Sequence, residues 1–130
     1  MHYDITSSWT AAKLNALSRE ELIGLFLDLP SPSLAEFDGE FEGHGAPYLP
    51  NLERHYLHAG LGKWLGKGYL AEPHGEWEGH GYNLWGTESG VTRRIRFGWG
   101  LGTSMLDGGP CILMHYSAFS NMYAELDLID

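Results

Sequence analysis

Hydrophobic positions follow two different periods along the chain. In residues 8–29 they recur at helical spacing, with Leu22, Leu25 and Leu29 on one face. The Ser-Arg-Glu-Glu run at 18–21 has the form of a capping box, in which the serine and the last glutamate satisfy backbone amides at the start of a helix. Prolines follow this segment at once and cannot continue it. The pattern therefore predicts an N-terminal helical region over 8–29.

After residue 38 apolar and polar positions alternate, which is typical of strands. The candidate strands are 40–45, 62–71, 75–85, 91–106, 110–119 and 123–129, with one further helical turn at 33–36 and a short helix at 51–58. The Asp-Gly-Gly-Pro run at 107–110 predicts a hairpin between two of them. Short connections favour antiparallel pairing, and closing such a meander removes its edges.

The expected fold is therefore mainly β, in one domain over residues 1–130. An N-terminal helix packs on an antiparallel, up-and-down, lipocalin-like β-barrel, and the barrel takes up residues 39–130.

Three segments repeat a glycine–aromatic pattern: GEFEGHG at 39–45, GKWLGKG at 62–68 and GEWEGHG at 75–81. In a strand, the glycines and the aromatic residue share one face. The other face carries Glu, Glu and His in two segments and Lys, Leu and Lys in the third, so only the glycine–aromatic face is common. Alternating glycines weaken a strand unless a ring or a sharp coil uses the space they leave. The shared face predicts that Trp64 and Trp77 point inward and are mostly buried.

The charged face of the same segments is predicted to lie in solvent. It carries Glu40, Glu76 and Glu78, and in the middle segment Lys63 and Lys67. Such residues are almost never fully buried unless they are paired. The repeated pattern is thus interpreted mainly as a structural feature of the strands, and any chemistry on the charged face as secondary.

A metal site is the alternative interpretation of the charged face, because histidine and carboxylate side chains are suitable ligands. The candidate ligands are His44, His80, Glu40, Glu42, Glu76 and Glu78. This arrangement would turn Phe41 and Trp77 into solvent, against the preference of aromatic rings for burial. No Cys-x-x-Cys or His-Glu-x-x-His spacing supports it. We therefore expect no metal and no other cofactor.

Charge and cysteine content narrow the class of protein. Lys and Arg number 8 against 17 Asp and Glu, a formal net charge of −9, which disfavours a nucleic-acid partner. The single cysteine, Cys111, lies in an apolar strand and is expected to be an inert buried thiol in a reducing compartment. No apolar stretch approaches the roughly 18 residues of a membrane span, and the first residues do not form a signal peptide. These features predict a cytoplasmic protein without a membrane partner.

The order of motifs resembles a known family. A helix ending in Leu-Phe-x-x-Leu-Pro at 25–30 is followed by Gly-Glu-Phe-Glu-Gly at 39–43 and Gly-Lys-Trp-Leu-Gly-Lys at 62–67. This is similar to the bacterial GxWxG-type lipocalin-like domains of unknown function, with Phe41 in place of the first tryptophan. The segment 75–81 is more loosely similar to the opening strand of nitrobindin-like haem barrels. The resemblance implies a calyx with an interior cavity and transfers no catalytic residue.

Polar groups within apolar strands are the candidates for chemistry. His115 and Tyr116 follow an apolar run, and alternation directs one of them inward whichever face is buried. We expect His115 to face the cavity, because Ile112 and Met114 are the better partners for the helix. General acid–base work would then fall to His115, Tyr116 and Tyr69, whereas a hydrogen-bonded core histidine is the alternative. The side chains expected to line a ligand slot are Trp64, Trp77, Trp85, Trp99, Tyr82 and Met114.

These features predict a barrel that encloses a small, largely apolar or aromatic molecule. If it is an enzyme, the lack of nucleotide, metal or nucleophile motifs leaves cofactor-free acid–base chemistry, that of an isomerase, cyclase or lyase. Two alternatives stay open. One is a haem barrel with His115 as axial ligand, and the other is a non-catalytic interaction module completed by another chain. Pairing of the strand at 123–129 with a second copy would make a homo-oligomer.

Overall fold

The computed structural model describes residues 9–44 and 62–119. Its N-terminal part contains the helices α1 (Ala11–Asn15) and α2 (Arg19–Asp28) and a 3-10 turn, η1 (Leu34–Glu36). The Ser18 hydroxyl accepts a hydrogen bond from the Glu21 amide at 3.1 Å, and the Glu21 carboxylate accepts one from the Ser18 amide at 3.0 Å. The predicted capping box is therefore confirmed, and it starts a new helix where the sequence predicted one continuous helical region.

Five strands form one antiparallel sheet in the order β1-β2-β3-β4-β5. They are β1 (Gly39–Glu42), β2 (Lys63–Leu70), β3 (Gly79–Thr87), β4 (Gly90–Thr103) and β5 (Pro110–His115), and a second 3-10 turn, η2 (Tyr116–Ala118), follows β5. Each strand pairs with the next one in the sequence, which confirms the predicted meander. The predicted hairpin between β4 and β5 is closed by a 2.8 Å bond from the Ser104 amide to the Gly109 carbonyl.

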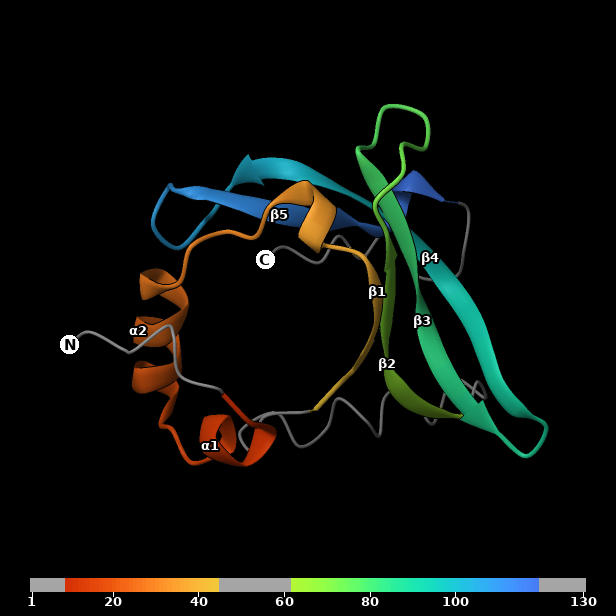
Figure 1. Cartoon of the computed structure of the whole chain (residues 1–130), viewed down its shortest axis with the longest axis horizontal. Helices are drawn as coiled ribbons and strands as arrows, with labels where there is room; N and C mark the ends of the chain where they lie inside the picture. The colour runs from red at the N-terminus through yellow and green to blue at the C-terminus, as the bar shows by residue number, and fades with distance from the viewer. Residues whose placement is uncertain (1–8, 45–61, 120–130) are drawn as a thin grey trace.

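The sheet curls into a half-barrel. Figure 1 shows the strands on a curved path from β1 to β5, with α2 on the side opposite β2 and β3. A closed lipocalin-like barrel is not confirmed, and the helix predicted at 51–58 and the strand predicted at 123–129 lie outside the described residues. In the described part of the chain, no helix combines the length and apolar character needed to cross a membrane.

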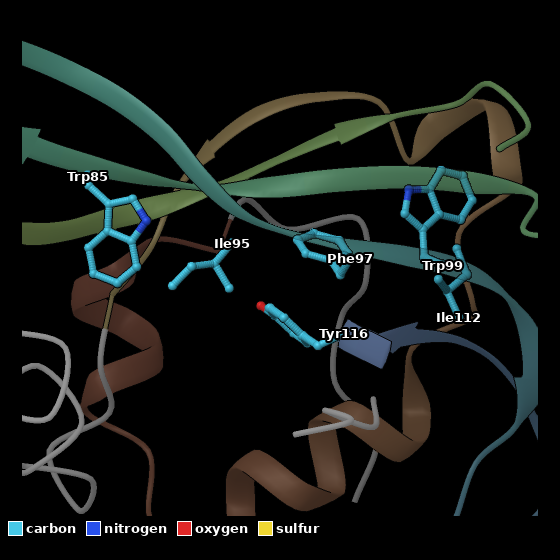
Figure 2. Close-up of a cluster of buried hydrophobic side chains, with 6 residues drawn as sticks. All are labelled: Trp85, Ile95, Phe97, Trp99, Ile112 and Tyr116. Atoms are coloured by element: carbon cyan, nitrogen blue, oxygen red, sulfur yellow. The ribbon is translucent and has the colours of Figure 1, made fainter. Parts of the chain in front are cut away.

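The hydrophobic core lies on the concave face of this curl. Figure 2 shows six of its buried side chains, from β3, β4, β5 and η2: Trp85, Ile95, Phe97, Trp99, Ile112 and Tyr116. The segment after α2 covers part of it, because the Phe37 ring lies 4.1 Å from the Tyr69 ring and 4.9 Å from the Trp99 ring, centroid to centroid. Burying a large side chain of this kind stabilises a fold by about 1.5–3 kcal/mol. The aromatic residues of the sheet are therefore its main source of packing energy.

The glycines of the repeated motif let rings from the neighbouring strand approach the backbone. Gly79 of β3 pairs with Trp99 of β4, and a Cβ atom on Gly79 would lie 2.0 Å from the Trp99 indole. The ring occupies the space that any larger residue at this position would need. The prediction that a ring uses this space is confirmed, but the ring belongs to another segment of the sequence.

The prediction that Trp77 shares an inward face with Gly79 is wrong. The strand begins only at Gly79, because the backbones of His74 and Trp77 exchange two hydrogen bonds of 3.0 Å and form a tight turn before it. A turn breaks the alternation on which the prediction depends. The Trp77 ring instead packs over Gly98 on the convex face of the sheet and is only half-buried.

Candidate functional site

A β-bulge in β2 determines which face Lys67 occupies. Trp64 pairs with Trp85, and the register then slips so that Gly66, not Leu65, makes the next pair. The extra residue places Trp64 and Lys67 on the same, concave face, although strict alternation would separate them. Only glycine fits at position 66, where φ is +154° and a Cβ atom would lie 2.0 Å from a carbonyl oxygen of β1. The prediction that Lys67 lies on the solvated outer face is therefore wrong.

Asn83 of β3 is the centre of the polar cluster to which Lys67 belongs. It is 1% exposed. Its Oδ1 accepts hydrogen bonds from Lys67 Nζ at 2.9 Å and from Trp64 Nε1 at 3.0 Å. Its Nδ2 donates to the Tyr116 hydroxyl at 3.0 Å and to the Ile95 carbonyl at 2.9 Å. These bonds use the whole hydrogen-bonding capacity of the amide. We refer to Lys67, Asn83 and Tyr116 as the amine cluster.

A second bulge, in β4, lies against this cluster. Between the pairs Gly81–Phe97 and Asn83–Arg94 the register shifts, and Ile95 takes a φ of +60°. A left-handed conformation is rare for a β-branched residue and costs of the order of 1–3 kcal/mol. The hydrogen bond from Asn83 to the Ile95 carbonyl satisfies a backbone group that the bulge removes from regular pairing. Strain of this kind persists where the surroundings fix it, and it often marks functional sites.

Lys67 lies in surroundings that disfavour its charge. Its Nζ donates to the Tyr116 hydroxyl as well as to Asn83, and it lies 5.1 Å from the Tyr116 ring centroid and 5.2 Å from that of Phe97. Within residues 9–44 and 62–119, no carboxylate forms an ion pair with it. Burial lowers the pKa of Lys67 from 10.5 to about 8. Roughly a tenth of the amine is then neutral, and therefore nucleophilic, at pH 7.

A cavity of about 410 Å³ lies between the sheet and the segment that follows α2. Its apolar and aromatic walls include Phe26, Leu29, Phe37, Tyr69, Ile112 and Met114. Burial raises the pKa of Tyr69 to about 12, so its hydroxyl stays protonated and can donate a hydrogen bond. The Phe97 ring lies between the cavity wall and the amine cluster, since its centroid lies 5.7 Å from that of Tyr69 and 5.2 Å from Lys67 Nζ. The residues that line the cavity do not include Lys67, Asn83 or Tyr116.

The concave face collects most of the side chains that the sequence predicted for the site. They are Tyr116 and Tyr69 among the catalytic candidates and Trp64, Trp85, Trp99 and Met114 among the ligand-binding ones. Ile112 and Met114 line the cavity together with Phe26 and Leu29 at the end of α2, whereas the sequence predicted that they pack on the helix and that the cavity lies on the other face of the strand. No observation tests a catalytic or binding role for these residues, and those roles stay predictions.

The structure places His115 outside this site, and the prediction that it faces the cavity is wrong. His115 pairs with Gly98, and its ring stacks on Trp77 at a centroid distance of 4.6 Å on the convex face. The alternation was correct, but Tyr116 is the residue that turns inward. The hollow beside His115 has a volume of about 130 Å³, well below the roughly 300–1,000 Å³ of pockets for organic ligands. This hollow does not fit a haem.

Tyr82 also lies on the convex face, although the sequence predicted it as a ligand contact. Its hydroxyl donates to Glu40 at 2.9 Å, and Arg93 Nε donates to the same carboxylate at 2.8 Å. The hydrogen bond from Arg93, followed by that from Tyr82, lowers the pKa of Glu40 below its usual value. The predicted exposure of Glu40, Glu76 and Glu78 is confirmed.

The histidines of the repeated motif have partners other than a metal. His80 is 8% exposed, and its Nε2 lies 3.0 Å from a Glu72 carboxylate oxygen while its Nδ1 lies 3.1 Å from Arg96 Nη2. His44 lies 3.5 Å from Glu42, near the surface. The residues that the structure describes contain no group of three or more histidine, cysteine or acidic side chains placed to hold a metal. The ligand set considered from the sequence is thus not gathered in one place there.

Sequence reasoning missed Lys67 and Asn83, which stand at the centre of the concave face. Asn83 carried a usable signal, because an amide in the middle of the run Gly-Tyr-Asn-Leu-Trp at 81–85 is a polar group in a strand expected to be buried. Lys67 carried none, since its position depends on a bulge that periodicity does not reveal.

No family model, curated protein or solved structure matches this chain. The resemblance to GxWxG-type lipocalin-like domains therefore stays a prediction from the motifs alone.

Proposed function

We propose that this chain binds a small, largely apolar molecule on the concave face of its half-barrel. The observation that carries the proposal is the cavity of about 410 Å³ with its aliphatic and aromatic walls. Its volume falls within the roughly 300–1,000 Å³ of small-molecule sites. In such sites a few polar groups orient a ligand that is held mainly by apolar contacts.

The polar groups available to orient the ligand are the protonated phenol of Tyr69 and the amine cluster. Tyr69 lines the cavity and stays protonated, because burial raises its pKa to about 12. Lys67 lies two residues earlier on β2, on the same face and roughly 6.6 Å away along the strand. A ligand with an apolar body and one polar end suits this arrangement. A cytoplasmic location is part of the proposal, since the single cysteine, Cys111, fits a reducing compartment.

The test is a binding titration with the apolar fluorophore 1-anilinonaphthalene-8-sulfonate, excited directly. The wild-type chain should show saturable binding. Met114→Trp places an indole in the cavity and should weaken that binding roughly tenfold or more, a loss of about 1.4 kcal/mol. The control Val91→Trp adds the same ring at an exposed position of β4 and should leave the affinity unchanged. Equal affinities for the two variants, or no saturable binding by the wild type, would contradict the proposal.

A further inference from the structure

Lys67 differs from the other lysines of the chain, Lys13 and Lys63. Both of those are exposed, whereas Lys67 is partly buried between aromatic rings. Two of the three donor positions of its ammonium group face Asn83 Oδ1 and the Tyr116 hydroxyl. An ammonium in a low-dielectric site is normally paired with a carboxylate. Here the described residues supply only neutral partners.

We propose that Lys67 is an imine-forming amine, and that the apolar ligand of the concave face is an aldehyde or ketone held by a reversible bond to Lys67 Nζ. This inference rests on the proposed binding function and specifies its ligand class. In this proposal the apolar body of the ligand lies in the cavity against Tyr69, and its carbonyl end extends past the Phe97 ring to the amine. Desolvated lysines with a lowered pKa are suited to this reaction, because the neutral amine is the nucleophile.

The phenol of Tyr116 is placed to move the protons that imine formation requires. The lone pair of neutral Nζ attacks the carbonyl carbon, and the oxygen takes up the proton that the nitrogen gives off, which yields a carbinolamine. The nitrogen lone pair then expels this hydroxyl group as water, with a proton from the Tyr116 phenol. Loss of the remaining N–H proton returns the phenol to its starting state and leaves the imine. No oxidant or reductant takes part.

Asn83 is a positioning residue in this scheme. It holds the amine and the phenol at once, because Oδ1 accepts from Lys67 and Nδ2 donates to Tyr116. Because Asn83 donates to the phenol oxygen, the phenol acts as an acceptor toward the amide and can act as a donor toward a neutral Nζ. The bulge in β2 lies opposite Leu84 and Trp85 and the bulge in β4 lies opposite Tyr82, so the two flank Asn83 on its strand.

Reductive trapping tests the proposal. The full chain is incubated with cinnamaldehyde and sodium cyanoborohydride near pH 7, and the adduct is followed by intact mass spectrometry and located in a tryptic digest. Modification of Lys67 blocks cleavage and joins the peptide that spans residues 64–93. We expect the adduct at Lys67 to form at least tenfold faster than at Lys13 or Lys63. Lys67→Arg, which keeps the charge and lacks a nucleophile at this pH, should lose it, and the control Lys63→Arg should keep it.

Two further measurements make the outcome decisive. Tyr116→Phe should slow trapping by roughly 10²-fold, the lower end of what a positioned proton donor contributes, while it should weaken the binding of cinnamyl alcohol by no more than about tenfold, the loss of one hydrogen bond. If the chain binds cinnamyl alcohol but no aldehyde is trapped, the imine proposal is overturned and the proposed binding function stands. If the chain neither binds the alcohol nor traps the aldehyde, both proposals are overturned. Two results would show that Lys67 is an ordinary cation. One is the labelling of all three lysines at the same rate. The other is that cinnamate binds more tightly than cinnamyl alcohol while cinnamaldehyde forms no adduct.

Discussion

Replacing Lys67 by methionine should stabilise the folded chain at neutral pH, although it removes two hydrogen bonds. The pKa of this amine falls from 10.5 to about 8 on folding, and each pH unit of that difference is worth about 1.4 kcal/mol. Charging the buried amine therefore costs the native state about 3 kcal/mol at pH 7. The lost bonds to Asn83 and Tyr116 contribute about 1 kcal/mol each. Lys67→Met should thus gain about 1 kcal/mol of unfolding free energy.

The sign of the pH dependence separates this explanation from simple repacking. Between the folded pKa of about 8 and the ordinary value of 10.5, the unfolded chain binds more protons than the folded one. The contribution of Lys67 to the unfolding free energy therefore rises with pH between about pH 8 and 10.5. From pH 7 to pH 9 the wild type should gain about 1 kcal/mol relative to Lys67→Met, and the advantage of the variant should vanish.

Urea unfolding followed by tryptophan fluorescence at pH 7, 8 and 9 measures these differences. Lys63→Met is the matched control for the loss of a lysine side chain from β2, since Lys63 lies exposed on the same strand. If the difference in unfolding free energy between the wild type and Lys67→Met stays constant from pH 7 to 9, the reasoning is refuted. The Lys67 amine would then titrate alike in the folded and unfolded states.

Three further predictions concern packing and the cluster. Gly79→Ala should destabilise the fold by about 1–3 kcal/mol in urea unfolding, because its Cβ would meet the Trp99 ring at 2.0 Å. Gly86→Ala, whose Cβ meets only Leu65 side-chain atoms at 3.4 Å or more, is the control and should cost far less, and equal losses would contradict the packing account. The buried Cys111 thiol should react with Ellman's reagent only as fast as the chain unfolds, and rapid labelling of the native protein would argue against this placement. Asn83→Leu should cost about 2–4 kcal/mol in the same unfolding assay, because it removes four hydrogen bonds of a buried amide, and a neutral effect would mean that the amine cluster is not formed.

Much of the fold could be predicted because it depends on local signals. The capping box at Ser18 and Glu21 fixes the start of α2 through bonds between residues three apart, and the glycines near residue 108 fix a hairpin. Closure could not be predicted, since it depends on how strongly the sheet coils and on contacts between distant residues. The sequence predicted a turn at 74–75 and a strand from residue 75, but the turn extends to Trp77 and the strand begins at Gly79. One pair of backbone hydrogen bonds overrides an alternation that continues in the sequence on both sides.

The candidate site could be predicted only where alternation holds. Trp85 and Trp99 were predicted as interior rings and lie in the buried cluster. For Tyr116 the alternation predicted only that either it or His115 faces inward. Lys67 lies beyond a bulge, so a one-residue slip moved it to the opposite face from the one expected. His115 was assigned to the wrong face because the two faces of β5 are similarly apolar, and only the location of Trp77 distinguishes them.

The central claim is that the bulge in β2 turns Lys67 into the concave face, where it meets neutral partners. The most direct test is an NMR titration of the lysine side chains in a chain labelled with ¹³C-lysine, in which only Lys13, Lys63 and Lys67 give signals and Lys67→Arg assigns the third. The Lys67 Cε resonance should titrate with a midpoint near pH 8, since burial lowers its pKa to about 8. A Lys67 midpoint close to 10.5, the ordinary value for a lysine, would place this amine in water and contradict the account.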